Sequence, residues 1–238
     1  MPPLRSPGRA VILSIQALVW LLFFLVSPAF SQDAGPSPGA VPAPGPAGLP
    51  PGQLAVGGVS VDAKQRTISF PAVVNMARGN LEYLVVAAHG KTHESLLRTE
   101  VRPYQIHVAL LLLGAKGSPR ALPLDPSQPP AGDRLEIEVS WEAKGNARSR
   151  RWRAEQFITD RKAGRVMRKG PWVYNGSRLR EDGFAAERDG SIVSLITDAD
   201  ALVNNPRRGR EDDDNWLVRP QHLPPLNSAV TVTFRLVR

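Results

Sequence analysis

Residues 135–141 read Leu-Glu-Ile-Glu-Val-Ser-Trp, and this stretch decides the class of fold. Apolar side chains occupy its odd positions, and polar side chains occupy its even positions. Because successive residues of a strand point to opposite faces, the pattern predicts a half-buried β-strand. The same alternation returns in residues 230–236, Val-Thr-Val-Thr-Phe-Arg-Leu, near the C-terminus. We therefore expect a final strand that closes a sheet.

Further strands follow from shorter patterns. Residues 56–61 and 66–70 flank a turn candidate at 62–65 and predict an opening hairpin. Residues 150–157 are expected to pair with the strand at 135–141, although 156–165 could instead hold a short helix. Two further apolar segments, at 172–174 and 192–196, are also predicted strands.

A second hairpin is predicted around a glycine. The apolar run from Leu81 to Ala88 reads as a strand, and His89-Gly90-Lys91 breaks it with a residue that can adopt a positive φ. Thr92 to Arg98 would then return as the antiparallel partner, with Glu82 opposite Arg98.

One convincing helix is predicted from Pro103 to Leu113. Proline suits the first helical position, and Gly114 stands just past the end. Its side chains leave hardly any polar face, so we expect a buried core helix that is too short to span a bilayer. The predicted fold class is therefore α+β: a mainly antiparallel β-sheet packed on one buried helix. The Pro- and Gly-rich residues 115–133 would form a functional flap or a disordered insertion.

The N-terminal region is predicted to direct the chain out of the cytoplasm. Arg5 and Arg9 precede an apolar run at 10–26, and small residues stand at Ala29 and Ser31, which together are typical of a signal peptide over residues 1–31. The alternative is an uncleaved membrane anchor formed by residues 10–26. Residues 32–52 are Pro-, Gly- and Ala-rich and are expected to form a disordered linker. Residues 53–238 would then form a single globular domain.

The amino-acid composition excludes several kinds of binding site and favours certain kinds of binding partner. The chain contains no cysteine, which excludes disulfides, thiolate zinc sites and iron–sulfur ligation. Removal of residues 1–31 would change the net charge from +8 to 28 − 22 = +6. A positive surface favours an anionic component of the cell envelope or another envelope protein as partner, and export argues against nucleic acid. Membrane contact is expected only if the signal is uncleaved.

Several short stretches resemble the YdjY domain family. The most specific is Gly90-Lys91 followed by His93-Glu94-Ser95. The others lie at 61–62, 68–72, 81–86, 107–114, 172–177 and 223–225. The resemblance spans most of residues 56–237 and implies an exported bacterial protein behind a signal peptide and a low-complexity tether. The family supplies no biochemical activity that could be transferred to this chain.

The sequence contains one candidate polar site made of ionisable and hydroxyl side chains. It comprises Lys91, His93, Glu94, Ser95 and His107. With His89, whose four-residue spacing from His93 would align two ligands on a helix, these residues could in principle hold a metal ion. On strands, however, His93 and Glu94 point to opposite faces, so we do not predict a metal site. The simpler interpretation is a polar hairpin end in which Glu82 or Glu94 pairs with Lys91 or Arg98, and His107 is a neutral core histidine.

A second candidate is a basic stretch between 148 and 169. Arg150, Arg151 and Arg153 could bind an anion through bidentate guanidinium contacts. We favour the alternative of a solvated strand edge whose positive charges discourage association of edges. The acidic residues 211–214 lack the spacing of a calcium loop and are expected to form a surface loop.

These observations favour an exported, non-enzymatic binding or interaction module at the cell envelope. No catalytic residue is assigned, and no cofactor is predicted. The alternative is a metal-dependent or hydrolytic enzyme centred on His93 and Glu94. It is the less favoured because no matched set of serine, histidine and carboxylate spacing is present.

Overall fold

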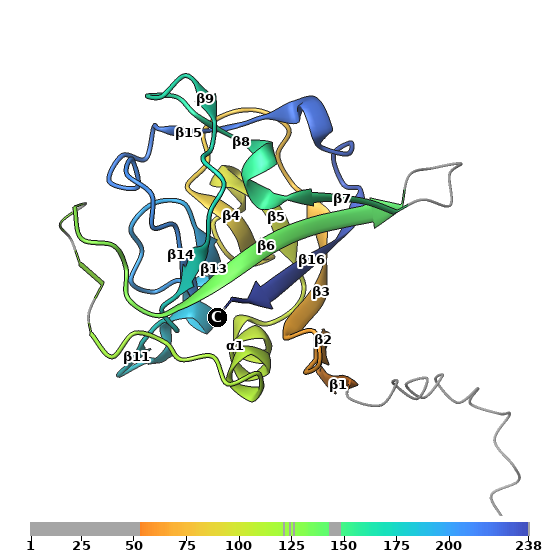
Figure 1. Ribbon diagram of the computed structural model, residues 1–238, viewed down its shortest axis with the longest axis vertical. Coiled ribbons are helices and arrows are strands. Elements are labelled where there is room, and N and C mark those ends of the chain that lie inside the picture. The colour runs from red at the N-terminus through yellow and green to blue at the C-terminus, as the bar shows by residue number, and fades with distance from the viewer. Residues whose placement is uncertain (1–52, 121, 124, 126, 143–148, 238) are drawn as a thin grey trace, which may run out of the picture. The chain divides into compact units, whose positions relative to one another are not determined.

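Eight strands close into a β-barrel in the computed structural model, which describes residues 53–237 except 121, 124, 126 and 143–148. The strands follow one another around the barrel in the order β3 (Thr67–Val74), β16 (Ala229–Leu236), β6 (Asp133–Glu142), β10 (Trp172–Tyr174), β14 (Val203–Asn204), β13 (Ser191–Ser194), β4 (Tyr83–Ala87) and β5 (Ser95–Thr99). β5 then pairs with β3, which completes the ring (Figure 1).

The predicted fold class, a sheet packed on one buried helix, is therefore wrong. Because the sheet closes on itself, its apolar face lies inside the barrel and needs no helix to cover it. Phe70 and Phe234 meet in this interior with their rings edge to face and their centroids 5.3 Å apart. The core is thus formed mainly by strands facing one another across the barrel.

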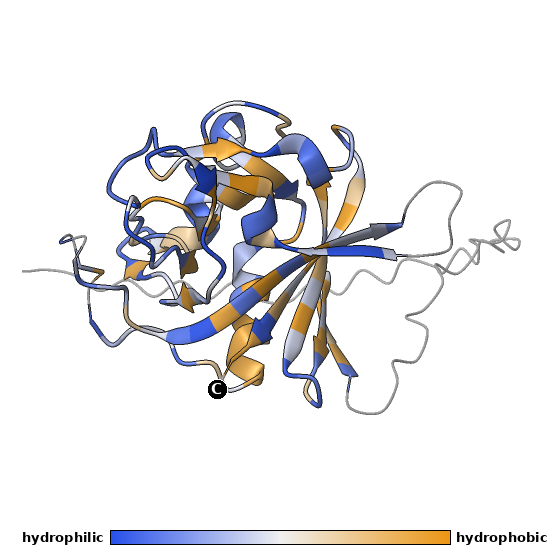
Figure 2. Ribbon diagram, turned by 45° about the horizontal axis from the view of Figure 1, so that its top comes forward, coloured by the Kyte–Doolittle hydropathy of each residue, from blue (hydrophilic) through white to orange (hydrophobic). Residues whose placement is uncertain are grey.

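The two strands predicted from alternation are confirmed. β6 and β16 are antiparallel neighbours, with Ile137 opposite Phe234 and Val139 opposite Val232. These four side chains are buried, and the residues between them are more exposed. Figure 2 shows the resulting alternation of hydropathy along β6. The period of two was sufficient to identify both strands and their buried faces.

The expected opening hairpin is also present, and the expected pairing of residues 150–157 holds up to Arg153, beyond which residues 154–157 form a 3-10 helix. β2 (Val59–Asp62) pairs antiparallel with β3, and the Asp62 carboxylate accepts a hydrogen bond from the Gln65 amide at 2.8 Å. β1 (Gln53–Val56) adds to the outer side of β2. β7 (Ser149–Arg153) pairs antiparallel with β6, as expected.

The second predicted hairpin is wrong because β4 and β5 are parallel. Tyr83 lies opposite Ser95 and Val86 lies opposite Arg98, so Glu82 does not face Arg98. Residues 88–94, which include the 3-10 turn η1 (Thr92–Glu94), carry the chain back to the start of β5. Every residue of β4 is buried, and a continuous apolar run is typical of parallel strands covered on both faces.

A close approach of two glycines shapes this connection. A Cβ atom on Gly190 would lie 2.7 Å from the Gly90 Cα, and Gly190 has a φ of +70°. Gly90 therefore serves backbone packing against the segment before β13, whereas the sequence pattern had indicated a hairpin turn.

The predicted helix is present as α1 (Pro103–Leu112), but its full burial is wrong. Ile106, Ala109 and Leu110 are buried in the core, whereas Leu111 and Leu112 are 49% and 56% exposed. α1 packs against β1, β2, β3 and α2 (Ala185–Asp189) at the end of the barrel where β3 begins, and only one side of it meets the core (Figure 1).

The remaining elements surround the barrel. They are η2 (Ala154–Phe157), the three-stranded sheet of β15 (Trp216–Val218), β8 (Ile158–Asp160) and β9 (Arg165–Val166), the hairpin of β11 (Leu179–Arg180) and β12 (Gly183–Phe184), α2 (Ala185–Asp189) and η3 (Pro220–His222). The alternative of a helix over 156–165 is wrong, since most of this range forms β8 and the turn to β9.

The described part of the loop before β6 is held against the barrel. The buried Arg210 guanidinium donates hydrogen bonds to the carbonyls of Asp125 and Gln128 at 3.1 and 2.6 Å. The Ser118 amide donates to the Asn175 carbonyl at 2.9 Å. These contacts connect the loop to both the barrel and the segment before β15.

The predicted signal peptide and linker, residues 1–31 and 32–52, lie outside the described residues. Within the part of the chain that is described, no helix has the length and hydrophobicity needed to cross a membrane.

Replacement of Phe234 by alanine tests the barrel interior. Phe234→Ala should lower the free energy of unfolding by about 3–5 kcal/mol, because it leaves a cavity beside Phe70. Thr231→Ala, on the exposed side of the same strand, should cost less than about 1 kcal/mol. Urea denaturation measures both values. Equal, small losses would place the Phe234 ring outside the core.

Candidate functional site

A polar pocket of about 530 Å³ lies beside the β4–β5 connection. Side chains from β4, the 88–94 connection, the end of α2, the start of β13 and the loop after β13 line it. They belong to Tyr83, His89, Lys91, His93, Arg188, Asp189, Ser191, Asp198 and Asp200. We call this the β4–β13 pocket. It collects ionisable groups from positions more than one hundred residues apart in the chain.

Tyr83 and Asp198 join two walls of the pocket. The buried Tyr83 hydroxyl donates a hydrogen bond to Asp198 Oδ2 at 3.0 Å. The other oxygen, Oδ1, accepts a hydrogen bond from the Asp200 amide at 2.8 Å. Burial, and then the neighbouring Asp198 carboxylate, raise the pKa of Tyr83, so its phenol remains protonated at neutral pH.

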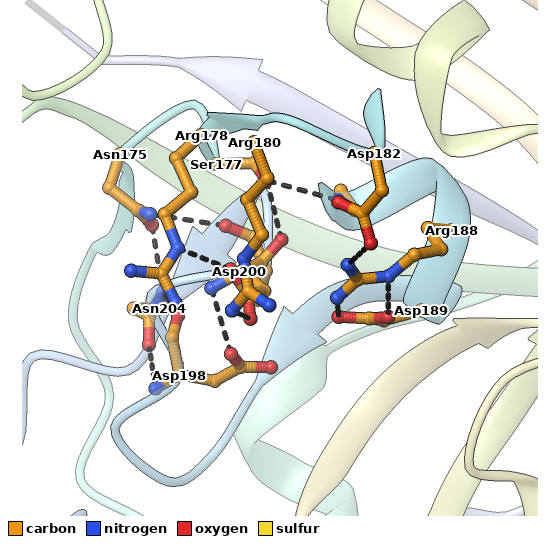
Figure 3. A network of polar contacts seen from close by, with 12 residues as sticks. Asn175, Ser177, Arg178, Arg180, Asp182, Arg188, Asp189, Asp198, Asp200 and Asn204 are labelled. Carbon is orange, nitrogen blue, oxygen red and sulfur yellow. Dashed lines mark hydrogen bonds and ion pairs between the residues drawn. The ribbon is translucent and has the colours of Figure 1, made fainter. Parts of the chain in front are cut away.

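Arginines hold the other two lining carboxylates. Asp200 accepts from Arg178 Nε at 2.5 Å and also from Arg180. Arg188 binds Asp189 through two parallel contacts of 2.6 and 2.8 Å. Figure 3 shows two groups of contacts: Asp200 with its two arginines, continuing through Asp198 to Asn204, and beside it Arg188 between Asp182 and Asp189. Because the arginine contacts are charge-assisted and one of them is bidentate, this wall of the pocket is rigid.

Lys91 bridges two glutamates at the edge of the pocket. Its Nζ lies 3.1 Å from Glu82 Oε2 and 3.2 Å from Glu94 Oε1, so the expected pairing of these carboxylates with Lys91 is confirmed. Burial raises the pKa of Glu82, and the hydrogen bond from Lys91 partly offsets this effect. Partial burial acts to lower the pKa of Lys91, but the Glu82 contact raises it overall.

The other members of the predicted polar site separate in space. His93 is next to Glu94, with 3.8 Å between Nε2 and Oε1, and its side chain is 77% exposed. Ser95 is buried in β5, where its hydroxyl donates to the Lys91 carbonyl. His107 lies on α1, and its Nδ1 is 2.8 Å from the Tyr174 hydroxyl. The structure thus brings Lys91, His93 and Glu94 together and leaves His107 elsewhere.

The histidines do not form a metal-binding set with Glu94. His89 directs Nε2 toward the Glu187 carbonyl at 2.9 Å. Among the described residues, the one group of histidine or acidic side chains close enough to share an ion is Asp212, Asp213 and Asp214. These are surface acids of the predicted acidic loop, and Asp212 pairs with Lys162 at 2.7 Å.

The three arginines of the predicted anion site differ in their surroundings. Arg151 pairs with Glu138 at 3.7 Å. Arg153 is largely buried between Glu136, at 2.6 Å, and Glu155, at 3.2 Å. The third arginine, Arg150, is exposed on β7. The predicted pairing with β6 therefore places Glu138 beside Arg151 and Glu136 beside Arg153.

Arg150 lines a second, larger hollow of about 1150 Å³ at the far end of β6. Prolines, Trp141 and the residues around 221–228 form most of its wall. Its described lining contains three ionisable side chains, those of Glu142, Arg150 and His222. The β4–β13 pocket is smaller and is lined by more ionisable side chains, and it is therefore the candidate site.

The sequence by its local patterns indicated only one edge of this pocket. The Gly-Lys-x-His-Glu-Ser stretch located Lys91 and His93, but Tyr83, Arg188 and Asp198 were not selected. The Asp198-Ala-Asp200 pair directly after the apolar segment 192–196 was an available signal, because polar side chains at the end of a buried strand often line sites.

Comparison with known families agrees with the sequence resemblance. Residues 59–235 match the YdjY domain. The chain belongs to the YdjY domain family. The matched range contains the whole barrel apart from the last residue of β16, and it contains every residue that lines the β4–β13 pocket. The function of this family is not established. Searches of curated proteins and of solved structures find no match.

The YdjY domain should lose stability in mild acid through His107. Burial lowers the pKa of His107, so below about pH 6.5 the unfolded chain binds a proton that the folded chain does not. Neutral His107 makes its full contribution to the free energy of unfolding above that pH. The contribution decreases as the pH falls toward the lowered pKa of His107. Urea titrations between about pH 8 and about pH 5 measure this decline.

His107→Gln should reduce the pH dependence, whereas His93→Gln, at an exposed histidine, should leave it unchanged. An identical pH dependence for the wild-type protein and His107→Gln would contradict the assignment of His107 as a half-buried neutral base.

Proposed function

We propose that this YdjY domain is a non-enzymatic binding module of the cell envelope, and that its β4–β13 pocket binds a small hydrogen-bonding ligand without negative charge. The observation that carries the proposal is the pairing of the pocket's charges. Arg188 and Asp200, on its lining, are already bound to partners of opposite sign. Such a wall offers fixed donors and acceptors, and little rearrangement is needed when a ligand enters.

The sign of the lining charge selects the ligand class. Two cations, Lys91 and Arg188, face three carboxylates, Asp189, Asp198 and Asp200, which gives 2 − 3 = −1. Asp198 is held by two hydrogen bonds from uncharged donors. A carboxylate with remaining acceptor capacity favours a hydroxyl or an ammonium group. The positive charge of the whole chain favours anions in general, but this local balance favours a polyhydroxylated or amine-bearing ligand.

The described groups around the pocket support binding better than turnover. Tyr83 has a raised pKa, which makes it a poor base at neutral pH. Ser95 is buried, and its hydroxyl already donates a hydrogen bond to the Lys91 carbonyl, so it is not available as a nucleophile. A hydrolytic centre at His93 and Glu94 would need a nucleophile or metal within reach of both residues, and Glu94 is instead engaged with Lys91.

The location at the cell envelope is supported by sequence. Residues 1–31 have the pattern of a signal peptide, and the chain contains no cysteine whose oxidation would matter after export. A ligand exposed at the envelope, such as a saccharide unit or an amine of a neighbouring molecule, fits both the location and the pocket.

Asp198→Asn tests the proposed site. Nuclear magnetic resonance titrations with a neutral disaccharide, a diamine and inorganic phosphate should shift pocket signals for the first or second probe and not for phosphate. Loss of the carboxylate should weaken that binding about tenfold to a hundredfold, because a hydrogen bond to a charged group contributes about 1.5–3 kcal/mol. The asparagine can still accept the Tyr83 hydrogen bond, so the fold should persist.

Asp213→Asn is the matched control, since this carboxylate is exposed and does not line the pocket. It should bind the same probe with unchanged affinity. Exclusive binding of phosphate, or equal affinities for wild-type protein and Asp198→Asn, would overturn the proposal.

A further inference from the structure

One side of α1 is apolar and faces outward. Tyr104, Val108, Leu111 and Leu112 follow a spacing of four, seven and eight residues, which places them within an arc of about 100° on a helix. We call them the α1 outer face. Tyr104 is 53% exposed, and the two leucines are exposed to a similar degree. Figure 2 shows α1 as a predominantly hydrophobic element at the periphery of the domain.

The buried side of the same helix explains why this face remains open. Ile106, Ala109 and Leu110 point into the barrel end. Within the outer face, the Tyr104 ring packs edge to face on Phe184 with centroids 6.3 Å apart, whereas Leu111 and Leu112 remain exposed. Exposed clusters of large apolar side chains are uncommon on monomeric proteins and are typical of interaction surfaces.

Four basic residues stand at the same end of the barrel. Lys116 lies just beyond the end of α1, where the Ala115 amide donates to the Leu110 carbonyl. The backbone carbonyls of Arg66 and Arg134 accept hydrogen bonds from Leu236 and from the residue after it. The fourth, Lys64, belongs to the turn that precedes Arg66. We call Lys64, Arg66, Lys116 and Arg134 the basic rim.

The charge of the rim is not cancelled by ion pairs within the described part of the chain. The nearby carboxylates of Asp62 and Asp133 instead accept backbone amides, those of Gln65 and Lys116, at 2.8 Å each. Four cations and two carboxylates give a local charge of 4 − 2 = +2. An apolar helix side bordered by basic residues is the pattern of a surface that binds anionic bilayers.

The chain enters the barrel on this side. β1 starts the described fold, packs against α1, and exposes Leu54. The sequence that precedes β1 contains the apolar run 10–26, which is predicted to direct the chain to a membrane. Where the run is retained as the uncleaved anchor, 52 − 26 = 26 residues separate it from β1, a length sufficient to reach a bilayer adjacent to α1.

From these observations we infer that the α1 outer face, bordered by the basic rim, docks on the surface of an anionic lipid bilayer. The leucines enter the boundary between headgroups and acyl chains, and the rim contacts the anionic headgroups. A second copy of this chain is the less suitable occupant, because it would bring two positive rims together. The inference goes beyond the proposed function and does not require the β4–β13 pocket to bind anything.

Lipid quenching of a fluorophore tests the contact in the full chain. Because the chain has no cysteine, Leu111→Cys allows one environment-sensitive label on the α1 outer face. Leu226→Cys is the matched control, an exposed leucine at the second hollow. In vesicles of phosphatidylcholine and phosphatidylglycerol, brominated acyl chains should quench the label at 111 several-fold more than the label at 226. Circular dichroism establishes that both labelled proteins are folded.

Charge variants then test the rim. Lys116→Ala in the Leu111→Cys background should lower the ratio of inserted to free label about fivefold, as expected for one basic residue near an anionic surface. Omission of phosphatidylglycerol should lower this ratio for the parent protein and abolish the difference between the two.

Equal quenching at 111 and 226 would overturn the inference, because tethering by residues 10–26 alone predicts no preference for α1. A label at 111 that is shielded from water without lipid quenching, together with a dimer in sedimentation, would also overturn it in favour of a second copy. A repeat with Tyr104→Cys keeps the test decisive if Leu111→Cys fails to fold.

Discussion

The pairing of β3 with β5 is the contact on which the rest of the structure depends. Val73 lies opposite Arg98 and Val74 opposite Leu97, and the Asn75 amide continues the contact to the Leu96 carbonyl at 2.8 Å. This short ladder joins the first and last strands of the eight-stranded sheet. Without it the sheet would keep two open edges and an uncovered apolar face. Closure instead places that face around a shared interior.

Closure also creates the candidate site. Since β4 must pair with β5 on one side and with β13 on the other, the connection after β4 is brought against the segment before β13. Gly90 and Gly190 allow the two backbones to touch there. Lys91 and Arg188, ninety-seven positions apart by 188 − 91, consequently line the same pocket. Ion pairs within the walls neutralise most of its charge before any ligand arrives.

The two ends of the barrel differ in chemistry because α1 occupies only one of them. Its buried side completes the core, and its outer side leaves Leu111 and Leu112 in contact with solvent. The far end contains the second hollow, which Trp141 and Arg150 line. Near it, the Trp152 ring stacks on His222 with ring centroids 3.9 Å apart. Buried ion pairs hold the region between β7 and β10. Glu155 binds Arg153 and Arg207, and burial lowers the pKa of Arg207 to about 10.

The sequence by itself determined the local features of this protein. Alternation identified β6 and β16 with their buried faces, proline and glycine bounded α1, and the Gly-Lys-x-His-Glu-Ser stretch indicated the YdjY domain. Local signals were sufficient because each depends on neighbours within a few positions in the chain. Lys91 with Glu82 and Glu94 could be predicted for the same reason, since all three lie within thirteen residues, 94 − 82 + 1.

Only the tertiary structure decided which strands distant in sequence are partners and which side chains from distant segments meet. The apolar run of β4 is compatible with a hairpin and with a parallel pair, and barrel closure selects the parallel one. The same closure determined that Asp198 would face Tyr83 and that His107 would lie apart from His93. Such contacts join residues far apart in sequence, and the free energy that selects them belongs to the packed barrel as a whole. No segment examined alone contains that information.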